Sequence, residues 1–199
     1  MKVIVIGALG DIGRAACTEL ADRHEVIKAG RSSGDIRVDI TDRASIDEMY
    51  RKSGKVDSVV SAVGDVHFGP LSNLTENQFM LGLTNKVMGQ VNVVLAGLKT
   101  ISDGGSFTLT SGVLDRDPVR QGTGAATANG ALGGFVKGAA IEMPRSLRVN
   151  VVSPGLLDVS APRYGSFFAG HEPVSSKRVG LAYAKSVEGA LTGQVIIVE

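Results

Sequence analysis

The segment "KVIVIGALGDIG", residues 2–13, decides the predicted fold of this chain. Its run VIVI is apolar and β-branched, which is typical of a strand buried on both faces of a parallel sheet. Gly7, Gly10 and Gly13 follow, and a helical pattern covers residues 11–23. Glycines at such a turn let the backbone approach a phosphate, and the helix N-terminus adds free amides and a positive dipole end. The segment predicts a dinucleotide-binding strand–turn–helix unit, with an ordinary tight turn as the alternative.

The rest of the chain alternates between strand and helix patterns. Strands are predicted at residues 25–30, 35–40, 55–63, 105–110, 147–153 and 193–198, and helices at residues 45–54, 75–100, 122–143 and 176–186. Gly54 and Thr75 are predicted to end one of these helices and to cap the next. Strict alternation predicts right-handed crossovers and a parallel sheet with helices on both faces. We therefore expect residues 1–199 to form a single α/β domain, doubly wound and Rossmann-type, with about seven strands.

Composition excludes several classes of function. The 21 basic and 20 acidic side chains are scattered along the 199 residues and give a formal charge of +1, so we expect neither nucleic-acid nor membrane-surface binding. The single cysteine, Cys17, excludes an internal disulfide and is predicted to be a buried helix residue. No run approaches the ~20 apolar residues of a membrane span, and the N-terminus does not resemble a signal peptide. We expect a cytoplasmic protein without a metal site.

The second predicted strand ends in "AGRSSGD", residues 29–35. NAD-binding domains usually have an acidic residue here that holds the adenosine ribose hydroxyls. This chain instead has Arg31, Ser32 and Ser33, and a guanidinium matches a phosphate with paired donors. The segment favours NADP(H) over NAD, with a solvated surface arginine as the alternative.

Several motifs together resemble the short-chain dehydrogenase/reductase family from Lys2 to the C-terminus. "GALGDIG" resembles its glycine motif, with Asp11 in the place of the usual middle glycine. "VDIT" and "SAVG", residues 38–41 and 61–64, resemble segments at the ends of later strands, and "RVNVVSPG", residues 148–155, is similar to its sixth strand. The resemblance implies these cofactor-binding residues: Gly7, Leu9, Gly10, Asp11, Ile12, Gly13, Arg31, Ser32, Ser33, Asp39, Ile40, Ser61, Ala62, Val63, Gly64, Lys86, Pro154, Gly155 and Leu157.

The family's catalytic residues are Asn, Ser, Tyr and Lys, and only the serine has a clear match, at Ser111. Counting back from "RVN" without gaps puts Ala125 at the tyrosine and Asn129 at the lysine, so the Tyr-x-x-x-Lys motif is replaced by Ala-x-x-x-Asn. Lys86 falls at the asparagine. A slip of one residue would restore Asn85 there but would misplace the following glycine.

The resemblance implies that the lost tyrosine exchanges a proton with the substrate oxygen and that the lost lysine lowers its pKa and holds the cofactor ribose. Alanine does neither, so the usual mechanism should be impaired by about 10²–10⁴ in rate. Asn129 can still contact a ribose hydroxyl. Lys86, on a helix facing the site, and Tyr164, in the loop that covers substrate in the family, are the candidate replacements. For Tyr164 and for His67 near the site, a structural or merely exposed role is the alternative.

The helix around residues 122–143 contains Gly130, Gly133, Gly134 and Gly138, which cost about 1 kcal/mol each in helix propensity relative to alanine. In the resembled family this helix and the preceding one pair across a two-fold axis. We therefore expect a homodimer or homotetramer. Close packing of the helix on its own sheet is the alternative explanation.

Two classes of function remain open. The first is an NADP(H)-dependent oxidoreductase that acts on a small carbonyl or alcohol with a non-standard acid/base group. The second is a non-catalytic NADP(H)-binding redox sensor or partner-binding protein. Retention of Ser111 favours the enzyme, whereas Ala125 and Asn129 favour the binding protein. The sequence does not identify a substrate.

Overall fold

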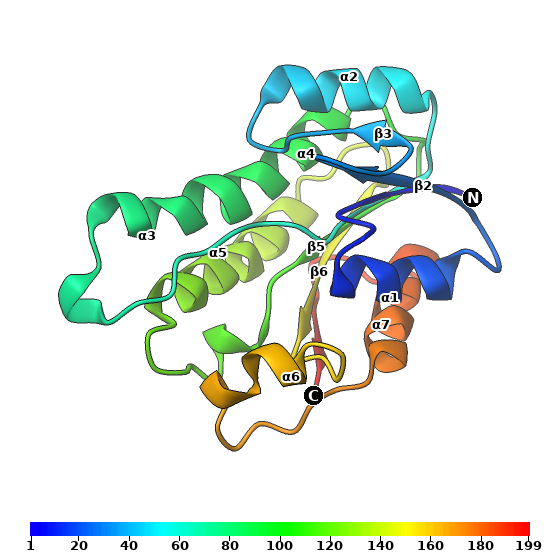
Figure 1. Ribbon diagram of the computed structural model, residues 1–199. Helices are drawn as coiled ribbons and strands as arrows, with labels where there is room; N and C mark the ends of the chain where they lie inside the picture. The colour runs from blue at the N-terminus through cyan, green and yellow to red at the C-terminus, as the bar shows by residue number, and fades with distance from the viewer.

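A computed structural model describes residues 1–199 as one seven-stranded parallel sheet with helices on both faces (Figure 1). The strands lie in the order β3-β2-β1-β4-β5-β6-β7, and every neighbouring pair is parallel. The order reverses between β1 and β4, because the chain first winds outward to β3 and then crosses back. Open α/β sheets bind ligands beyond the carboxyl ends of the strands at such a reversal.

The strands are β1 (Lys2–Ile6), β2 (Glu25–Gly30), β3 (Ile36–Arg37), β4 (Ser58–Ser61), β5 (Ser106–Thr110), β6 (Arg148–Pro154) and β7 (Val195–Val198). The α-helices are α1 (Asp11–Leu20), α2 (Arg43–Ser53), α3 (Glu76–Gly82), α4 (Gly89–Gly97), α5 (Thr123–Ala140), α6 (Ala161–Tyr164) and α7 (Ser176–Glu188). This arrangement confirms the predicted single doubly wound domain.

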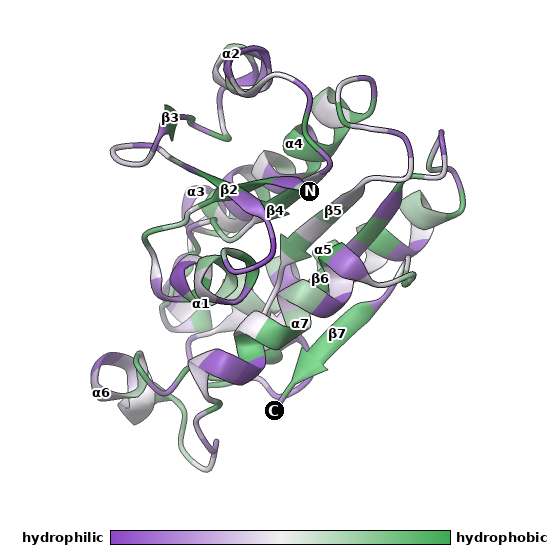
Figure 2. Ribbon diagram, turned by 90° about the vertical axis from the view of Figure 1, so that its right-hand side faces the viewer, coloured by the Kyte–Doolittle hydropathy of each residue, from purple (hydrophilic) through white to green (hydrophobic).

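Alternate residues of each buried strand face two separate cores. On one face, Val3 and Val5 of β1 pack with α1 and α7, whose apolar residues include Leu20 and Tyr183. On the other face, Ile4 and the facing residues of β4 and β5 pack with α2, α4 and α5. Figure 2 shows the apolar edge strand β7 and, set apart from both helix layers, the short helix α6. Burial of both faces is the reason that these strands read as continuous apolar runs.

The third strand is shorter than the predicted residues 35–40. After Ile36 and Arg37, the Asp39 N–H donates to Ser45 Oγ at 2.9 Å, and the Asp39 carboxylate accepts bonds from Thr41. These side-chain hydrogen bonds replace those between strands and direct the chain towards the start of α2. The predicted strand at residues 55–63 is likewise reduced to Ser58–Ser61, the part that pairs with β1.

The helix predicted over residues 75–100 is divided in three. Thr75 caps α3 as predicted, and Gln78 completes a capping box with it. A wide π-helical turn, η2 (Leu83–Met88), then separates α3 from α4. A π turn spaces its hydrogen bonds by five residues rather than four and often occurs at functional sites. The α2 helix ends at Ser53, directly before Gly54 as predicted. None of the helices is both long enough and apolar enough to cross a membrane.

Candidate active-site cleft

A cleft of about 370 Å³ opens at the carboxyl ends of β1, β4 and β5, where the strand order reverses. It extends from the end of β2, where Arg31 lies, past the glycine turn after β1 to the π turn. Its lining residues are Ile6, Gly7, Gly10, Ile12, Gly30, Arg31, Val38, Asp39, Ile40, Ala62, Val63, Gly64, Asp65, Asn85, Lys86, Thr110 and Ser111.

The glycine turn forms one wall of this cleft. Gly7 has a φ of +80°, which a residue with a side chain rarely adopts, and a Cβ there would collide with Val63 and with the Ala62 carbonyl. At Gly10, by contrast, an added Cβ would have only the Gly7 carbonyl oxygen within 4 Å, at 3.5 Å. The first turn of α1 follows, and its amides have no partner within the helix. The wall can therefore hold an anionic group such as a pyrophosphate.

Asp11 begins α1, but its carboxylate does not line the cleft. It accepts a 2.7 Å hydrogen bond from Ser160 Oγ and forms an ion pair with Arg163 on α6. The residue in place of the family's middle glycine thus connects the helix start to the segment that follows β6. Its negative charge is favourable at this end of a helix dipole.

Arg31 lies at the opposite end of the cleft, directly after β2. Its guanidinium is exposed and forms no hydrogen bond or ion pair within the chain. Asp39 also lines the cleft; hydrogen bonds from Thr41, and less strongly the charge of Arg31, hold the pKa of its carboxyl below the usual range. Ser32 and Ser33 do not line the cleft. Arg31 is therefore the side chain at this end that can meet an additional phosphate.

The backbone that carries Ser111 is held on one side by a side chain instead of a neighbouring strand. At the end of β5, the side chain of the buried residue Gln90 accepts a hydrogen bond from Thr110 N–H and donates one to its carbonyl oxygen, each at 2.9 Å. On the other side the Ser111 N–H donates to Val152 O at 2.9 Å. The backbone that carries the serine is thus fixed from α4 and from β6.

Lys86 crosses the floor of the cleft from the π turn. A Cβ on Gly64, whose φ is +132°, would lie 2.6 Å from Lys86 Cβ, so the lysine stem lies against bare backbone. The Lys86 ammonium donates a 3.0 Å hydrogen bond to the Ser111 carbonyl oxygen. Burial lowers the pKa of Lys86 to about 8, while Asp115 opposes this shift. The amine is therefore fixed between the ends of β4 and β5.

Three polar atoms at this end of the sheet have no hydrogen-bond partner. They are Ser61 Oγ, Ser111 Oγ and Asn129 Oδ1, all on residues at most 4% exposed. Asn129 comes from α5, and its amide nitrogen lies 3.1 Å from the Cβ position of Gly112, next to Ser111. Unpaired buried polar atoms are costly and are usually explained by a water, an ion or a function. Of these residues only Ser111 lines the cleft, so its hydroxyl is the one that can meet a ligand there.

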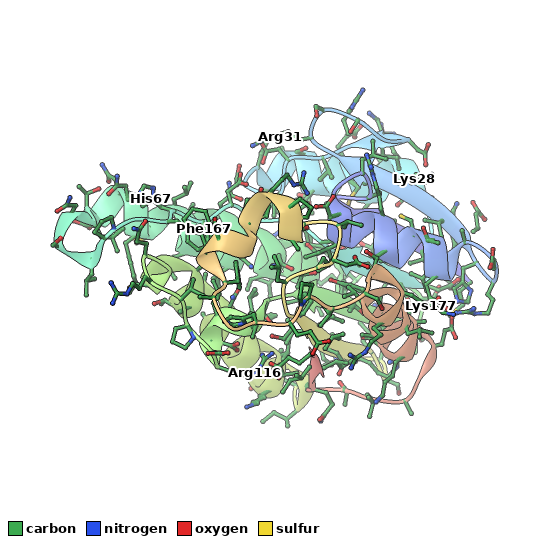
Figure 3. The ribbon with its side chains drawn as sticks, turned by 60° about the horizontal axis from the view of Figure 1, so that its bottom comes forward. Lys28, Arg31, His67, Arg116, Phe167 and Lys177 are labelled. Atoms are coloured by element: carbon green, nitrogen blue, oxygen red, sulfur yellow. The ribbon has the colours of Figure 1, made fainter.

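Ala125, one turn before Asn129, is buried in a small apolar cluster. Val113 and Leu114 are its buried neighbours, and Val66 and Phe168 pack against them. The side chains of this cluster that pack around Ala125 are all apolar. Phe168 belongs to the segment after α6, which extends across this end of the molecule. Figure 3 looks onto that segment and shows Phe167 on it, with Arg31 and His67 on two sides.

The structure brings together most of the residues predicted to bind a cofactor. Those that line the cleft are Gly7, Gly10, Ile12, Arg31, Asp39, Ile40, Ala62, Val63, Gly64 and Lys86, joined by Ser111. Those that do not are Leu9, Asp11, Gly13, Ser32, Ser33, Ser61, Pro154, Gly155 and Leu157, together with Asn129 and Tyr164. Tyr164 is 51% exposed on α6.

Sequence reasoning did not include Asp65 and Thr110 among the site residues, and it named Asn85 only as an alternative to Lys86. Asp65 follows Gly64, and Thr110 precedes Ser111. Both could have been predicted, because ligands bind beyond the carboxyl ends of parallel strands. Asn85 Oδ1 accepts a 3.1 Å hydrogen bond from Asp65 N–H. Asn85 and Lys86 both line the cleft from the wide turn, so either alignment of the family asparagine places a residue of the cleft there.

Comparison with known proteins assigns the chain to a family. A family model described as enoyl-(acyl carrier protein) reductase matches residues 4–182. The matched relatives include a short-chain dehydrogenase/reductase from Pestalotiopsis microspora, 28% identical over 157 residues, which are 75% of this chain and 59% of that protein. The chain belongs to the short-chain dehydrogenase/reductase family.

Solved structures agree in fold and in length. The crystal structure of the protein lin1944 from Listeria innocua is 48% identical, with a TM-score of 0.98 and full coverage of both chains. A small-chain dehydrogenase in complex with NADPH is 27% identical, with a TM-score of 0.86 over 100% of this chain and 96% of that chain. The first curated relatives are longer, and the match covers 50–59% of their lengths.

Proposed function

We propose that this protein is an NADP(H)-dependent oxidoreductase that interconverts a small carbonyl compound and its alcohol without the usual tyrosine–lysine pair. The observation that carries the proposal is the cleft itself, which combines a glycine turn, the unpaired Arg31 and the hydroxyl of Ser111. A related structure described as a complex with NADPH supports the choice of a nicotinamide cofactor.

The residues present fit such a cofactor. The backbone around Gly7 and Gly10 would hold the pyrophosphate, and Arg31 would hold the adenosine 2′-phosphate. Asn129 does not line the cleft, but its unpartnered oxygen is the atom that would accept a hydrogen bond from a ribose hydroxyl. When bound, the cofactor supplies or accepts a hydride at its nicotinamide ring. Ser111 Oγ would donate a hydrogen bond to the substrate oxygen, and the apolar cluster around Ala125 would exclude water beside it.

A second candidate is a protein that binds NADP(H) without catalysis. The apolar surroundings of Ala125 favour it, because no acid or base lies where the resemblance places the tyrosine. A relative from Escherichia coli, 28% identical over 125 residues, is called a cyclic-di-GMP-binding biofilm dispersal mediator protein, so the relatives of this chain are not named only for enzymes. The retained Ser111 hydroxyl, which has no structural partner, favours the enzyme.

Titration with NADPH and NADH tests the cofactor assignment. We expect NADPH to bind at least tenfold more tightly, because a charge-assisted hydrogen bond contributes roughly 1.5–3 kcal/mol. The Arg31→Ala variant should lose most of this difference. Calorimetry or cofactor fluorescence measures both dissociation constants.

Arg37→Ala is the matched control, since Arg37 is an exposed arginine on β3 that does not line the cleft. It should keep the preference for NADPH. Equal affinities of the unaltered protein for the two cofactors would contradict the assignment to NADP(H), and failure to bind either would contradict the proposed function as a whole.

A further inference from the structure

We propose that Lys86 is the proton donor and acceptor of this site, in place of the missing tyrosine–lysine pair; the inference rests on the proposed oxidoreductase function. Lys86 is the lysine that lines the cleft, and it lies beside the residue expected to hold the substrate oxygen. Its ammonium is bonded to the carbonyl of Ser111 at 3.0 Å.

Contacts with neighbouring backbone hold the Lys86 side chain in the cleft. Bare backbone at Gly64 leaves room for its stem, and a side chain at that position would collide with it at 2.6 Å. The wide turn η2 lets both Asn85 and Lys86 line the cleft. Asn85 Oδ1 is held by the Asp65 N–H, so the turn that carries the lysine is tied to the end of β4.

The unpaired hydroxyl of Ser111 indicates where a substrate oxygen would lie. The Ser111 hydroxyl belongs to the same residue whose carbonyl holds the lysine, and it has no partner within the chain. A carbonyl oxygen bound by this hydroxyl would lie close to the Lys86 ammonium. Ala125, at the position of the lost tyrosine, does not line the cleft and belongs to a buried apolar cluster.

The reaction then balances as a carbonyl reduction. With bound NADPH as the hydride source, a nicotinamide C–H bond would break to leave NADP⁺, a C–H bond would form at the carbonyl carbon, and the electron pair of the C=O π bond would move to oxygen. Lys86 gives one proton to that oxygen, which yields the alcohol and a neutral amine. Water then returns a proton to the amine. In alcohol oxidation the neutral amine accepts the hydroxyl proton.

The ionisation of Lys86 suits this exchange. Burial lowers the pKa of Lys86 to about 8, close to neutral pH, where a proton donor is most effective. The charged groups around it are Asp65 at the end of β4 and Asp115, which is itself paired with Arg116, while α5 contributes the neutral Ala125 and Asn129. Asp115 is the one that raises the pKa of Lys86. Reduction should therefore slow as the pH rises through about 8.

The Lys86→Arg and Lys86→Met variants separate proton transfer from charge. Arginine keeps the positive charge but does not release a proton in proteins. We expect Lys86→Arg to bind NADPH within about threefold of the unaltered protein and to reduce p-nitrobenzaldehyde and 9,10-phenanthrenequinone on the order of 10²–10⁴-fold more slowly. Lys86→Met should be equally slow. Lys99→Met, at an exposed lysine beyond α4, is the control and should keep full turnover.

Amine labelling tests the same residue without turnover. In the cofactor-free protein, acetylation of Lys86 by acetic anhydride, followed by mass spectrometry across a pH series, should show a midpoint near pH 8. A midpoint near the ordinary value of ~10.4 would overturn the proposal. Turnover retained in Lys86→Arg, or NADPH binding without turnover of either carbonyl by the unaltered protein, would also overturn it. Failure to bind NADPH would instead contradict the proposed function.

Discussion

At the scale of single residues, the Ser111 hydroxyl is costly to the folded protein. It is buried and has no hydrogen-bond partner, whereas the hydroxyl of the preceding Thr110 donates to Ser61 O at 2.7 Å and lies 2.5 Å from Tyr183 Oη. An unpaired buried hydroxyl costs about 1–3 kcal/mol, and a paired one contributes to stability. At the end of β5 the paired Thr110 hydroxyl therefore stabilises the fold, whereas the unpaired Ser111 hydroxyl does not.

This difference predicts opposite effects of removing the two hydroxyls. Ser111→Ala should leave the free energy of unfolding unchanged or raise it by about 1 kcal/mol, because it removes an unsatisfied group. It should also slow any carbonyl reduction by about 10²-fold, since the hydrogen bond to the substrate oxygen is lost. Denaturant unfolding and turnover with NADPH measure the two effects.

Thr110→Val is the comparison variant. It should lower the free energy of unfolding by about 1–3 kcal/mol, because it leaves Ser61 O and the Tyr183 hydroxyl without their partner. A Ser111→Ala variant as unstable as Thr110→Val would mean that Ser111 is held by a structural bond.

At the scale of the element, the glycines of α5 differ in their surroundings. A Cβ on Gly133 would lie 3.6 Å from a methyl group of Val195, which is an ordinary contact. A Cβ on Gly134 or Gly138 would meet nothing within 4 Å. Close packing on the chain's own sheet, the alternative considered from the sequence, therefore does not explain the last two. They lie with Leu95 and Phe135 along a groove between α4 and α5.

We therefore retain the prediction that α5 and the preceding helix contact another copy of the chain, and this groove lies between them. Gly134→Leu should reduce a dimer or tetramer to smaller species, because the added side chain would separate the helices. Light scattering at micromolar concentration measures the mass. If the unaltered protein is a monomer, these two glycines have no role in assembly.

Gly134→Ala on an isolated chain would gain about 1 kcal/mol of helix propensity. A gain of this size in a monomeric protein, measured by thermal unfolding, would therefore agree with the absence of a partner. A loss of stability in an oligomeric protein would agree with an interface at this position.

At the scale of the whole molecule, carboxylates connect segments that are distant in sequence. Asp57, just before β4, accepts hydrogen bonds from Lys2 N–H at 2.7 Å and from Ser102 Oγ at 2.8 Å. The backbone bond from Lys2 and then the bond from Ser102 hold the pKa of the Asp57 carboxyl below its usual range. Since the folded pKa is the lower one, this contribution to stability is present above about pH 4 and is lost as the pH falls through the folded pKa.

The Asp57→Asn variant should therefore be less stable than the unaltered protein at pH 7, and the difference should shrink towards pH 3. Urea unfolding at several pH values measures this difference. Asp22→Asn, at an exposed residue without a hydrogen bond or ion pair, is the control and should change little. A constant deficit in Asp57→Asn at all pH values would indicate a packing effect instead of lost carboxylate bonds.

The sequence alone determined the alternation of strands with the main helices, and the edge of the sheet at which the cleft lies. Apolar β-branched runs report burial on both faces, and glycines at the end of β1 report a close backbone approach, so both signals are local. Gly7, Arg31 and Gly64 could therefore be assigned to the cleft from the sequence. The same local signals marked the capping residue Thr75.

Only the tertiary structure decided which polar atoms lack a partner and where the charged groups point. The end of β5 that carries Ser111 is held by Gln90 of α4, the hydrogen bond of Lys86 joins residues 25 apart, and Asp11 turns away from the cleft towards Arg163, 152 residues along the chain. No periodicity in the sequence records such contacts, because they form between segments that meet only after the sheet has assembled. The wide turn that carries Lys86 could not be predicted from the sequence, for a related reason. Its residues have an ordinary helical pattern, and the departure from α-helical spacing appears only in the backbone hydrogen bonds.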